Sequence, residues 1–170
     1  MGFLELIIFM LPCYIANAAP VIVGGGWRLD QGIVLGDGRP VLGKTKTVRG
    51  FLGGIAMGIV AAGVLALLWP NLLFGNPEIL FASGAMLAIG ALVGDAAGSF
   101  IKRRMDISPG KHCQVLDQVD FIAGGLVFAY PFAYSIYTLP NLIFIVVVSY
   151  LLHVGTNMLA NRAGLKKVPW

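Results

Sequence analysis

Five long apolar stretches constrain the fold of this chain more than any other feature of its sequence. A helix needs roughly 20 apolar residues to cross about 30 Å of hydrocarbon. Hydrophobic residues make up 58% of the 170 residues, which leaves no sequence for a separate soluble domain. The sequence therefore predicts one all-α integral membrane domain, residues 1–170, with about five transmembrane helices. The expected spans are residues 3–23, 51–69, 79–101, 119–138 and 142–160.

The basic residues predict how the helices are oriented in the cell membrane. All twelve Lys and Arg residues fall within residues 28–49, 102–111 and 162–167, and the other two loops contain none. With five spans these three segments lie on one side, which the positive-inside rule identifies as the cytoplasm. We therefore expect a multi-pass protein with its N-terminus outside and its C-terminus inside. The cytoplasmic loops, residues 24–50 and 102–118, would then form a polar catalytic pocket.

The first apolar stretch could instead be a signal peptide, because Ala16-Asn17-Ala18 imitates a cleavage site of small residues. No Lys or Arg precedes it, however, and Glu5 lies where a signal peptide has positive charge. We therefore expect it to be a retained span, with a kink or an unwound cytoplasmic end at Pro20 and the glycines of residues 24–26. Cys13 and Cys113 are expected to be free thiols.

Polar residues interrupt the third apolar stretch at its cytoplasmic end. An ionised side chain at membrane depth is disfavoured by at least roughly 2.5–3.5 kcal/mol, so it marks a functional site by default. Positions three, four, seven and eight apart share one helix face. The spacing therefore predicts a single polar stripe, formed by Asp95, Ser99, Lys102 and Arg103.

Two further acids begin the fourth apolar stretch, where Asp117 and Asp120 lie three residues apart on one helix face. Mg²⁺ prefers oxygen ligands and usually combines one or two carboxylates with substrate phosphates. We therefore predict that Asp95, Asp117 and Asp120 bind Mg²⁺. The alternative is that Asp117 caps its helix while Asp120 pairs with Lys102 or Arg103, and for either acid alone this is the better interpretation.

A second group of cations and hydroxyls precedes the second span. A helix N-terminus attracts anions through its free N–H groups and its dipole, so the segment is a candidate phosphate site. The alternative is helix capping by Thr45 or Thr47. The match of residues 38–45 to the phosphate-binding loop G-x-x-x-x-G-K-[ST] is dismissed, because no buried strand precedes it. The candidate residues are Lys44, Thr45, Thr47 and Arg49.

Asn17 in the first span is a further candidate substrate-binding residue, although it could equally bond a neighbouring helix. The spacing Gly54-x-x-x-Gly58 predicts close helix packing rather than function. His112 and His153 are interpreted as structural.

The polar residues around the third and fourth spans resemble a known signature, that of the CTP-dependent phosphatidate cytidylyltransferases. Two departures are visible: residues 111–114 stand where that family has H-G-G, and Gln118 replaces an arginine. With Lys44-Thr45-x-Thr47-x-Arg49-Gly50 in the first loop and only five spans, the chain is similar to the archaeal branch, the CDP-archaeol synthases. The matching run is Gly94-Asp95…Ser99-x-x-Lys102-Arg103…Pro109-Gly110…Asp117-Gln118-Val119-Asp120.

The resemblance implies a Mg²⁺-dependent reaction of CTP with an isoprenoid glycerol ether-lipid phosphate, which yields CDP-archaeol and pyrophosphate. The lipid tails would remain among the membrane lipids, and no nucleic-acid partner is expected. The three acids would hold the metal and, with Lys102, form the catalytic set. Ser99, Lys102 and Arg103 would bind the triphosphate, and the residues of the first loop would neutralise the remaining phosphates.

Three other functions are compatible with parts of the sequence. A CTP-dependent lipid kinase would use a similar site but release CDP. A small transporter or channel could use Glu5, Asn17 and Asp95 as an ion path. A membrane scaffold would account for the glycines but leave the acids unexplained.

Overall fold

The computed structural model describes residues 2–73, 75–109, 113 and 116–165. Five of its helical segments are long and apolar enough to cross a membrane, which confirms the predicted all-α membrane fold. Among the described residues the only β structure is two isolated bridges. The elements in chain order are α1 (Phe3–Ala18), α2 (Pro20–Val23), α3 (Val48–Leu68), α4 (Pro77–Arg104), α5 (Leu116–Ala133), the 3-10 helix η1 (Tyr134–Ile136) and α6 (Leu139–Arg162).

Helix ends differ by a few residues from the predicted spans because capping, rather than hydropathy, determines where a helix begins. The Asn76 side chain accepts hydrogen bonds from the N–H groups of Glu78 and Ile79, at 2.9 and 3.1 Å, and starts α4 before the apolar stretch. At its other end α4 continues through the basic residues to Arg104. Helix α4 therefore extends beyond the apolar stretch of residues 79–101.

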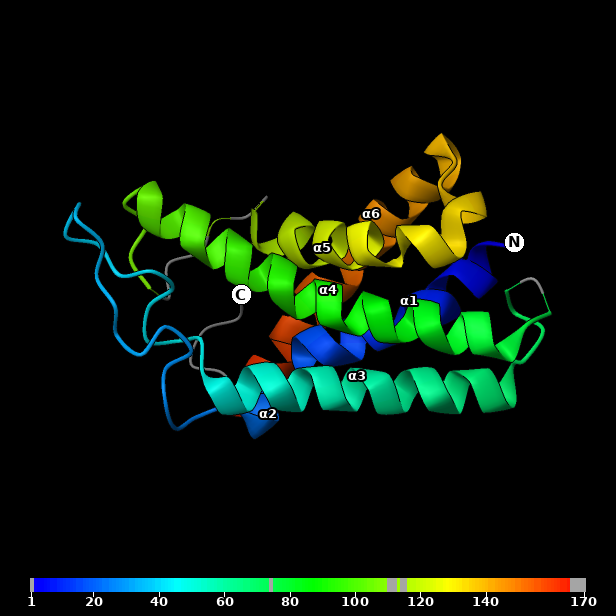
Figure 1. Ribbon diagram of the computed structural model, residues 1–170, viewed down its shortest axis with the longest axis horizontal. Helices are drawn as coiled ribbons and strands as arrows, with labels where there is room; N and C mark the ends of the chain where they lie inside the picture. Colours follow the sequence, from blue (N-terminus) through cyan, green and yellow to red (C-terminus); the bar gives the residue numbers. More distant parts are fainter. Residues whose placement is uncertain (1, 74, 110–112, 114–115, 166–170) are drawn as a thin grey trace.

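Helix α4 is the centre of the bundle. It packs against α1, α3 and α5, and Figure 1 shows it running between α3 and α5. Helix α1 contributes fully buried side chains to the core, including Leu6, Phe9 and Met10. Helix α6 is the most peripheral span, because only 17% of the residues in its apolar stretch are buried, a smaller share than in any of the other four spans.

Glycines let α5 approach the backbone of α4. A Cβ atom added to Gly90 would lie 2.3 Å from the carbonyl oxygen of Gly124, and one added to Gly94 would lie 2.2 Å from that of Asp120. Both distances are far below a van der Waals contact, so these helices can meet here only without side chains. The contact holds Asp120 directly against α4.

The Gly54-x-x-x-Gly58 spacing in α3 serves packing, as predicted. A Cβ atom on Gly54 would lie 2.7 Å from the carbonyl oxygen of Ala16 in α1, and one on Gly58 would lie 2.4 Å from the Cβ of Ala88 in α4. The predicted unwinding at the cytoplasmic end of the first span is confirmed as well, since α2 ends after one turn and Gly24 is extended. The chain then enters the loop of residues 24–47.

Asp30 organises this loop from its interior. Its carboxylate accepts backbone hydrogen bonds from Gly32, Leu42 and Gly43, at 3.0, 2.9 and 2.8 Å. Burial opposes ionisation of the group, but these N–H donors outweigh burial and hold the pKa of Asp30 below its ordinary value. A single carboxylate thus ties together two distant parts of the loop.

Replacing Asp30 by Asn is expected to loosen the loop and to cost about 1–3 kcal/mol of stability, because buried N–H groups lose an acceptor. Since the folded-state pKa is depressed, the stabilisation exists above the unfolded-state pKa and disappears as pH falls through the folded-state value. Hydrogen exchange at Leu42 and Gly43 should therefore accelerate in Asp30→Asn at neutral pH. In the unchanged protein their protection, measured relative to the intrinsic exchange rate at each pH, should fall only below about pH 4. Equal protection in both proteins at neutral pH would contradict this role.

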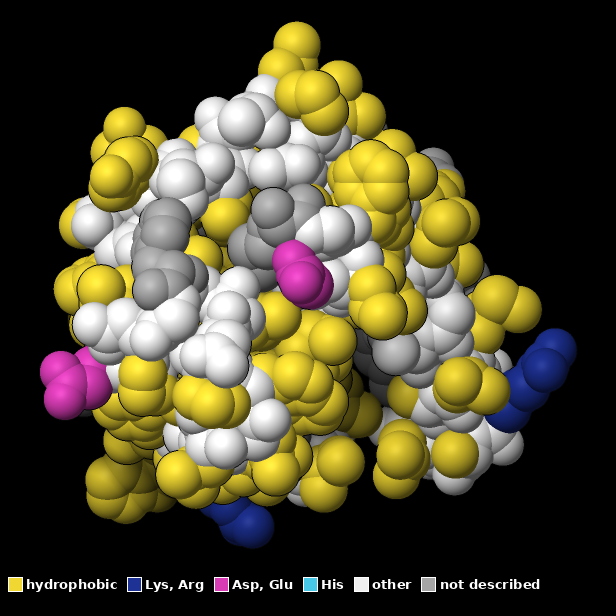
Figure 2. All heavy atoms as spheres, turned by 90° about the vertical axis from the view of Figure 1, so that its right-hand side faces the viewer, with side chains coloured by type: hydrophobic (Ala, Val, Ile, Leu, Met, Phe, Trp, Pro, Cys, Tyr) yellow, Lys and Arg dark blue, Asp and Glu magenta, His cyan; other side chains and the backbone are white. Residues whose placement is uncertain are grey.

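The loop is fastened to the end of α4. Arg104 donates to the carboxylate of Asp37 and to the carbonyl oxygen of Pro40, both at 2.6 Å, and Arg39 donates to the carbonyl oxygen of Arg104 at 2.5 Å. The start of α3 and the ends of α4 and α6 lie at this same end of the bundle (Figure 1). Figure 2 shows the opposite end, where hydrophobic and uncharged atoms predominate and Lys and Arg side chains appear only at the margins. The basic residues are therefore concentrated at one end of the molecule.

Candidate active site

The polar stripe of α4 faces the interior, as its spacing predicts. Ser99, Lys102 and Arg103 are only 3%, 8% and 5% exposed, and the Asp95 side chain is 20% exposed. The Nε and Nη1 atoms of Arg103 are buried and have no hydrogen-bond partner within the described part of the chain. A buried guanidinium with unused N–H donors is well suited to bind an anion such as a phosphate.

Asp117 pairs with Lys102. The ammonium group of Lys102 donates to one carboxylate oxygen of Asp117, and the other oxygen accepts the N–H of Cys113 at 2.9 Å. Asp117 lies in the first turn of α5, where an acid is stabilised by the helix dipole. The partner of Lys102 is therefore Asp117, not Asp120 as the alternative interpretation proposed.

Asp120 is the least compensated acid of the site. It is 9% exposed, its Oδ1 accepts the N–H of Phe121 at 2.6 Å, and its buried Oδ2 has no partner among the residues that the structure describes. A Cβ atom on Gly98 would lie 2.1 Å from that Oδ2, so this glycine makes the space in which the carboxylate sits. Asp95, Lys46 and Lys102 lie within electrostatic range of Asp120. An unsatisfied buried acceptor is costly and points to a cation or donor that binds there.

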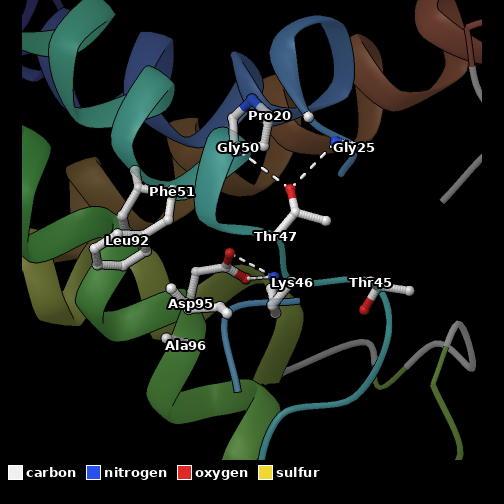
Figure 3. A pocket seen from close by; sticks show the side chains of 12 residues that line it. Pro20, Gly25, Thr45, Lys46, Thr47, Gly50, Phe51, Leu92, Asp95 and Ala96 are labelled. Carbon is white, nitrogen blue, oxygen red and sulfur yellow. Dashed lines mark hydrogen bonds and ion pairs between the residues drawn. The ribbon is translucent and has the colours of Figure 1, made fainter. Parts of the chain in front are cut away.

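Lys46 connects the loop to α4 and is a site residue that sequence reasoning missed. Its ammonium group lies 2.5 Å from both oxygens of Asp95 (Figure 3). The pair borders a cavity of about 90 Å³ between the end of α2, the loop, the start of α3 and α4, lined in part by Gly24, Thr45 and Phe51. Lys46 was one of five basic residues in the loop, and nothing in the sequence distinguished the one that points inward.

Two of the four predicted loop residues, Thr45 and Thr47, line this cavity. Thr45 lines it, while Lys44 and Arg49 are exposed. Thr47 also lines the cavity, and its hydroxyl group caps α3 by accepting the N–H of Gly50 at 3.1 Å. The same hydroxyl group accepts the N–H of Gly25 in the loop at 3.2 Å. The capping role foreseen as an alternative for Thr47 is confirmed. No strand precedes the helix in the described residues 2–73, so the phosphate-binding-loop match remains dismissed.

Other expected residues lie apart from the cavity. Asn17 is half-buried in α1 and does not line the cavity. His153 stacks on Phe121, with ring centroids 5.7 Å apart, which suits its structural interpretation. Cys13 and Cys113 are free thiols, as predicted. The signature residues Gly110, Lys111, His112 and Gln114 lie outside the described residues.

The three acids do not converge on one point in this arrangement. Within the described ranges no group of three or more His, Cys, Asp or Glu side chains is placed to hold a metal ion. Instead, lysine ammonium groups compensate Asp95 and Asp117. The donor chemistry nevertheless fits Mg²⁺, because all candidate ligands are carboxylates and the Oδ2 of Asp120 is an unused acceptor.

Comparison with known proteins identifies the family. Residues 2–170 match the family model described as CarS-like, CDP-archaeol synthase. The chain is 42% identical to the CDP-archaeol synthase of Pyrococcus furiosus, with 98% of each chain covered. It is 47% identical to that of Aeropyrum pernix, with 98% of this chain and 92% of the relative covered.

A solved structure agrees with these sequence matches. It is an intramembrane enzyme for archaeal membrane lipid biosynthesis, 41% identical to this chain, with a TM-score of 0.83. The similarity covers 92% of this chain and 94% of that one. The chain therefore belongs to the CDP-archaeol synthase family.

Proposed function

We propose that this protein transfers the cytidylyl group of CTP to an isoprenoid glycerol ether-lipid phosphate and so forms CDP-archaeol and pyrophosphate. Membership of the family supports the reaction. One structural observation supports the location of the site: the loop of residues 24–47 meets the acidic and basic residues of α4 and α5 at the basic end of the bundle, through Lys46 and Asp95. In the orientation that the positive-inside rule favours, this end and the C-terminus are cytoplasmic and the N-terminus is outside.

The reaction requires little general acid–base catalysis from the protein. A phosphate oxygen of the lipid attacks the α-phosphorus of CTP, the bond from that phosphorus to the bridging oxygen breaks, and pyrophosphate leaves. The nucleophile is already an anion, so no general base is required. Positioning the two substrates and neutralising their charge are therefore the main catalytic tasks.

The α4 stripe is proposed to bind the triphosphate. Arg103 offers two buried donor atoms without partners in the described residues. Lys102 and Ser99 lie on the same buried face, so cationic and hydroxyl donors point into one region. Phosphate oxygens are well matched to such donors, because hydrogen bonds between charged partners are stronger than neutral ones.

Asp95, Asp117 and Asp120 are the proposed ligands of Mg²⁺, which when bound would polarise the phosphoryl group and neutralise charge on the leaving pyrophosphate. Asp120 is the strongest of the three candidates, since its Oδ2 is unpaired in the structure described. Asp95 and Asp117 are paired with lysines, so their negative charge becomes fully available to a metal ion once those lysines move to another anion. The lysines thereby link the metal ligands to the binding of phosphate.

The first loop is proposed to offset repulsion between the two anionic substrates. Lys44 and Arg49 are exposed and are sequence neighbours of Thr45 and Gly50, which line the cavity, so their positive charge would raise the local concentration of anionic substrates. Asn17, on the helix that leads to the cavity through α2, remains a proposed substrate-binding residue. The lipid tails would stay in the bilayer beside the helices.

The test is an assay of the purified protein with labelled CTP, Mg²⁺ and a geranylgeranyl glycerol ether phosphate. We expect a labelled lipid and an equal amount of pyrophosphate. Release of CDP with an unlabelled lipid would instead show a kinase. Ion movement across liposomes by protein that never consumes CTP would show a transporter, and either result would overturn the proposal.

A further inference from the structure

The contact between Lys46 and Asp95 links the loop directly to the acids of the candidate site. The Lys46 ammonium group lies 2.5 Å from both carboxylate oxygens, and the two side chains are 24% and 20% exposed. Figure 3 shows the pair at the side of the cavity, below Thr47. Because both oxygens face the ammonium group, Lys46 occupies the side of the carboxylate on which both oxygens could hold a metal ion together.

The cavity beside Lys46 could hold a second partner for its ammonium group. The cavity is bordered by Thr47 and Gly50 at the start of α3, where the helix dipole favours an anion. Lys46 directly precedes this start and belongs to the same cavity lining. A phosphate group in the cavity would therefore offer the ammonium group an alternative partner without a rearrangement of the helices.

We propose that Lys46 exchanges between Asp95 and a nucleotide phosphate, so that nucleotide binding releases Asp95 for the metal ion. This inference rests on the proposed function, because it assumes that the cavity receives a nucleotide phosphate. In the free protein Lys46 takes the place of the cation on Asp95 and opposes metal binding. Binding of nucleotide and metal is then coupled, and the coupling acts equally in both directions.

The proposal makes opposite predictions for the two ligands. In Lys46→Met, Asp95 loses its competing cation, so the affinity for Mn²⁺ without nucleotide should rise about tenfold. The same change removes a phosphate partner, so the affinity for CTP in EDTA should fall about tenfold. A residue that only maintained the fold would weaken both. Electron paramagnetic resonance measures free Mn²⁺, and equilibrium dialysis of labelled CTP measures the nucleotide.

Arg28→Met is the matched control, because it removes one exposed positive charge from the same loop. We expect it to change Mn²⁺ affinity by less than about twofold, since long-range charge effects are screened by salt. Adding Asp95→Asn to Lys46→Met should abolish the gain in Mn²⁺ affinity. Thermal unfolding with and without Mg²⁺ provides a second measurement: Mg²⁺ alone should stabilise Lys46→Met more than the unchanged protein.

Several outcomes would overturn the exchange. An equal rise in Mn²⁺ affinity in Arg28→Met and Lys46→Met would show a general charge effect. A gain that persists with Asp95→Asn would place the metal elsewhere, and weaker binding of both ligands would show a purely structural role. Each of these results leaves the proposed function intact if the unchanged protein forms CDP-lipid. Failure of the unchanged protein to bind CTP or form that product would instead reject the function itself.

Discussion

Replacing Asp120 by Asn is expected to lower Mg²⁺-dependent cytidylyl transfer by at least about 100-fold, because preorganised charge at a reacting phosphoryl group contributes this much or more. Asn preserves the size of the side chain but removes the negative charge. Asp120 is the acid whose Oδ2 is buried and unpaired in the described structure, and it lies against the backbone of α4. The measurement is the rate of labelled CDP-lipid formation at saturating Mg²⁺.

Asp106→Asn provides the matched control. Asp106 follows the end of α4, its side chain is 81% exposed, and its contact with Arg39 is a surface ion pair of 3.4 Å. Its φ of 64° is one that Asn adopts readily, so the backbone should not be strained. We expect nearly full activity from this variant. A folded Asp120→Asn protein with activity similar to that of Asp106→Asn would remove Asp120 from the metal role.

Gly98→Ala should lower the rate by about 100-fold, because a displacement of roughly 1 Å in a catalytic group has an effect of that size. The added Cβ would lie 2.1 Å from the Oδ2 of Asp120 and 2.7 Å from its Cβ and Cγ atoms. Rotating the carboxylate cannot relieve a clash that also involves the Cβ atom of Asp120. The side chain must therefore move together with the backbone of α5. The rate of CDP-lipid formation and thermal unfolding in the same detergent test both consequences.

Gly155→Ala separates this steric effect from a general effect of alanine in a membrane helix. Gly155 lies within α6, and a Cβ atom there would meet nothing within 4 Å in the described structure. We expect unchanged activity and a stability that is equal or slightly higher, since glycine is a poor helix former. Similar rates for Gly98→Ala and Gly155→Ala would mean that the close approach at Gly98 does not position Asp120.

The polar face of α4 could be predicted because helix geometry is local. The spacing from Asp95 to Arg103 places those side chains on one face whatever the rest of the chain does. The bilayer then forces that face to point toward the other helices, because charged side chains at membrane depth are tolerated inside the bundle but not against lipid. The buried positions of Ser99, Lys102 and Arg103 agree with this prediction.

The pairing of the acids could not be predicted in the same way. Asp117 meets Lys102 and Asp95 meets Lys46, so two of the three acids are compensated in the arrangement described. Asp120 differs from them because the glycines of α4 allow the backbone of α5 to come close, which leaves its Oδ2 in a narrow space. Such contacts depend on how two helices cross, and the residues of one helix do not specify that crossing.

By itself the sequence determined the five spans, the concentration of charge at one end and the polar stripe of α4, because hydrophobicity and helical periodicity act over short stretches of chain. Only the tertiary structure singled out Lys46 among the basic residues of the first loop. That choice depends on the path of the loop, which Asp30 fixes from inside and Arg104 fastens to α4. A long-range contact of this kind results from many weak interactions acting together, so no short motif encodes it.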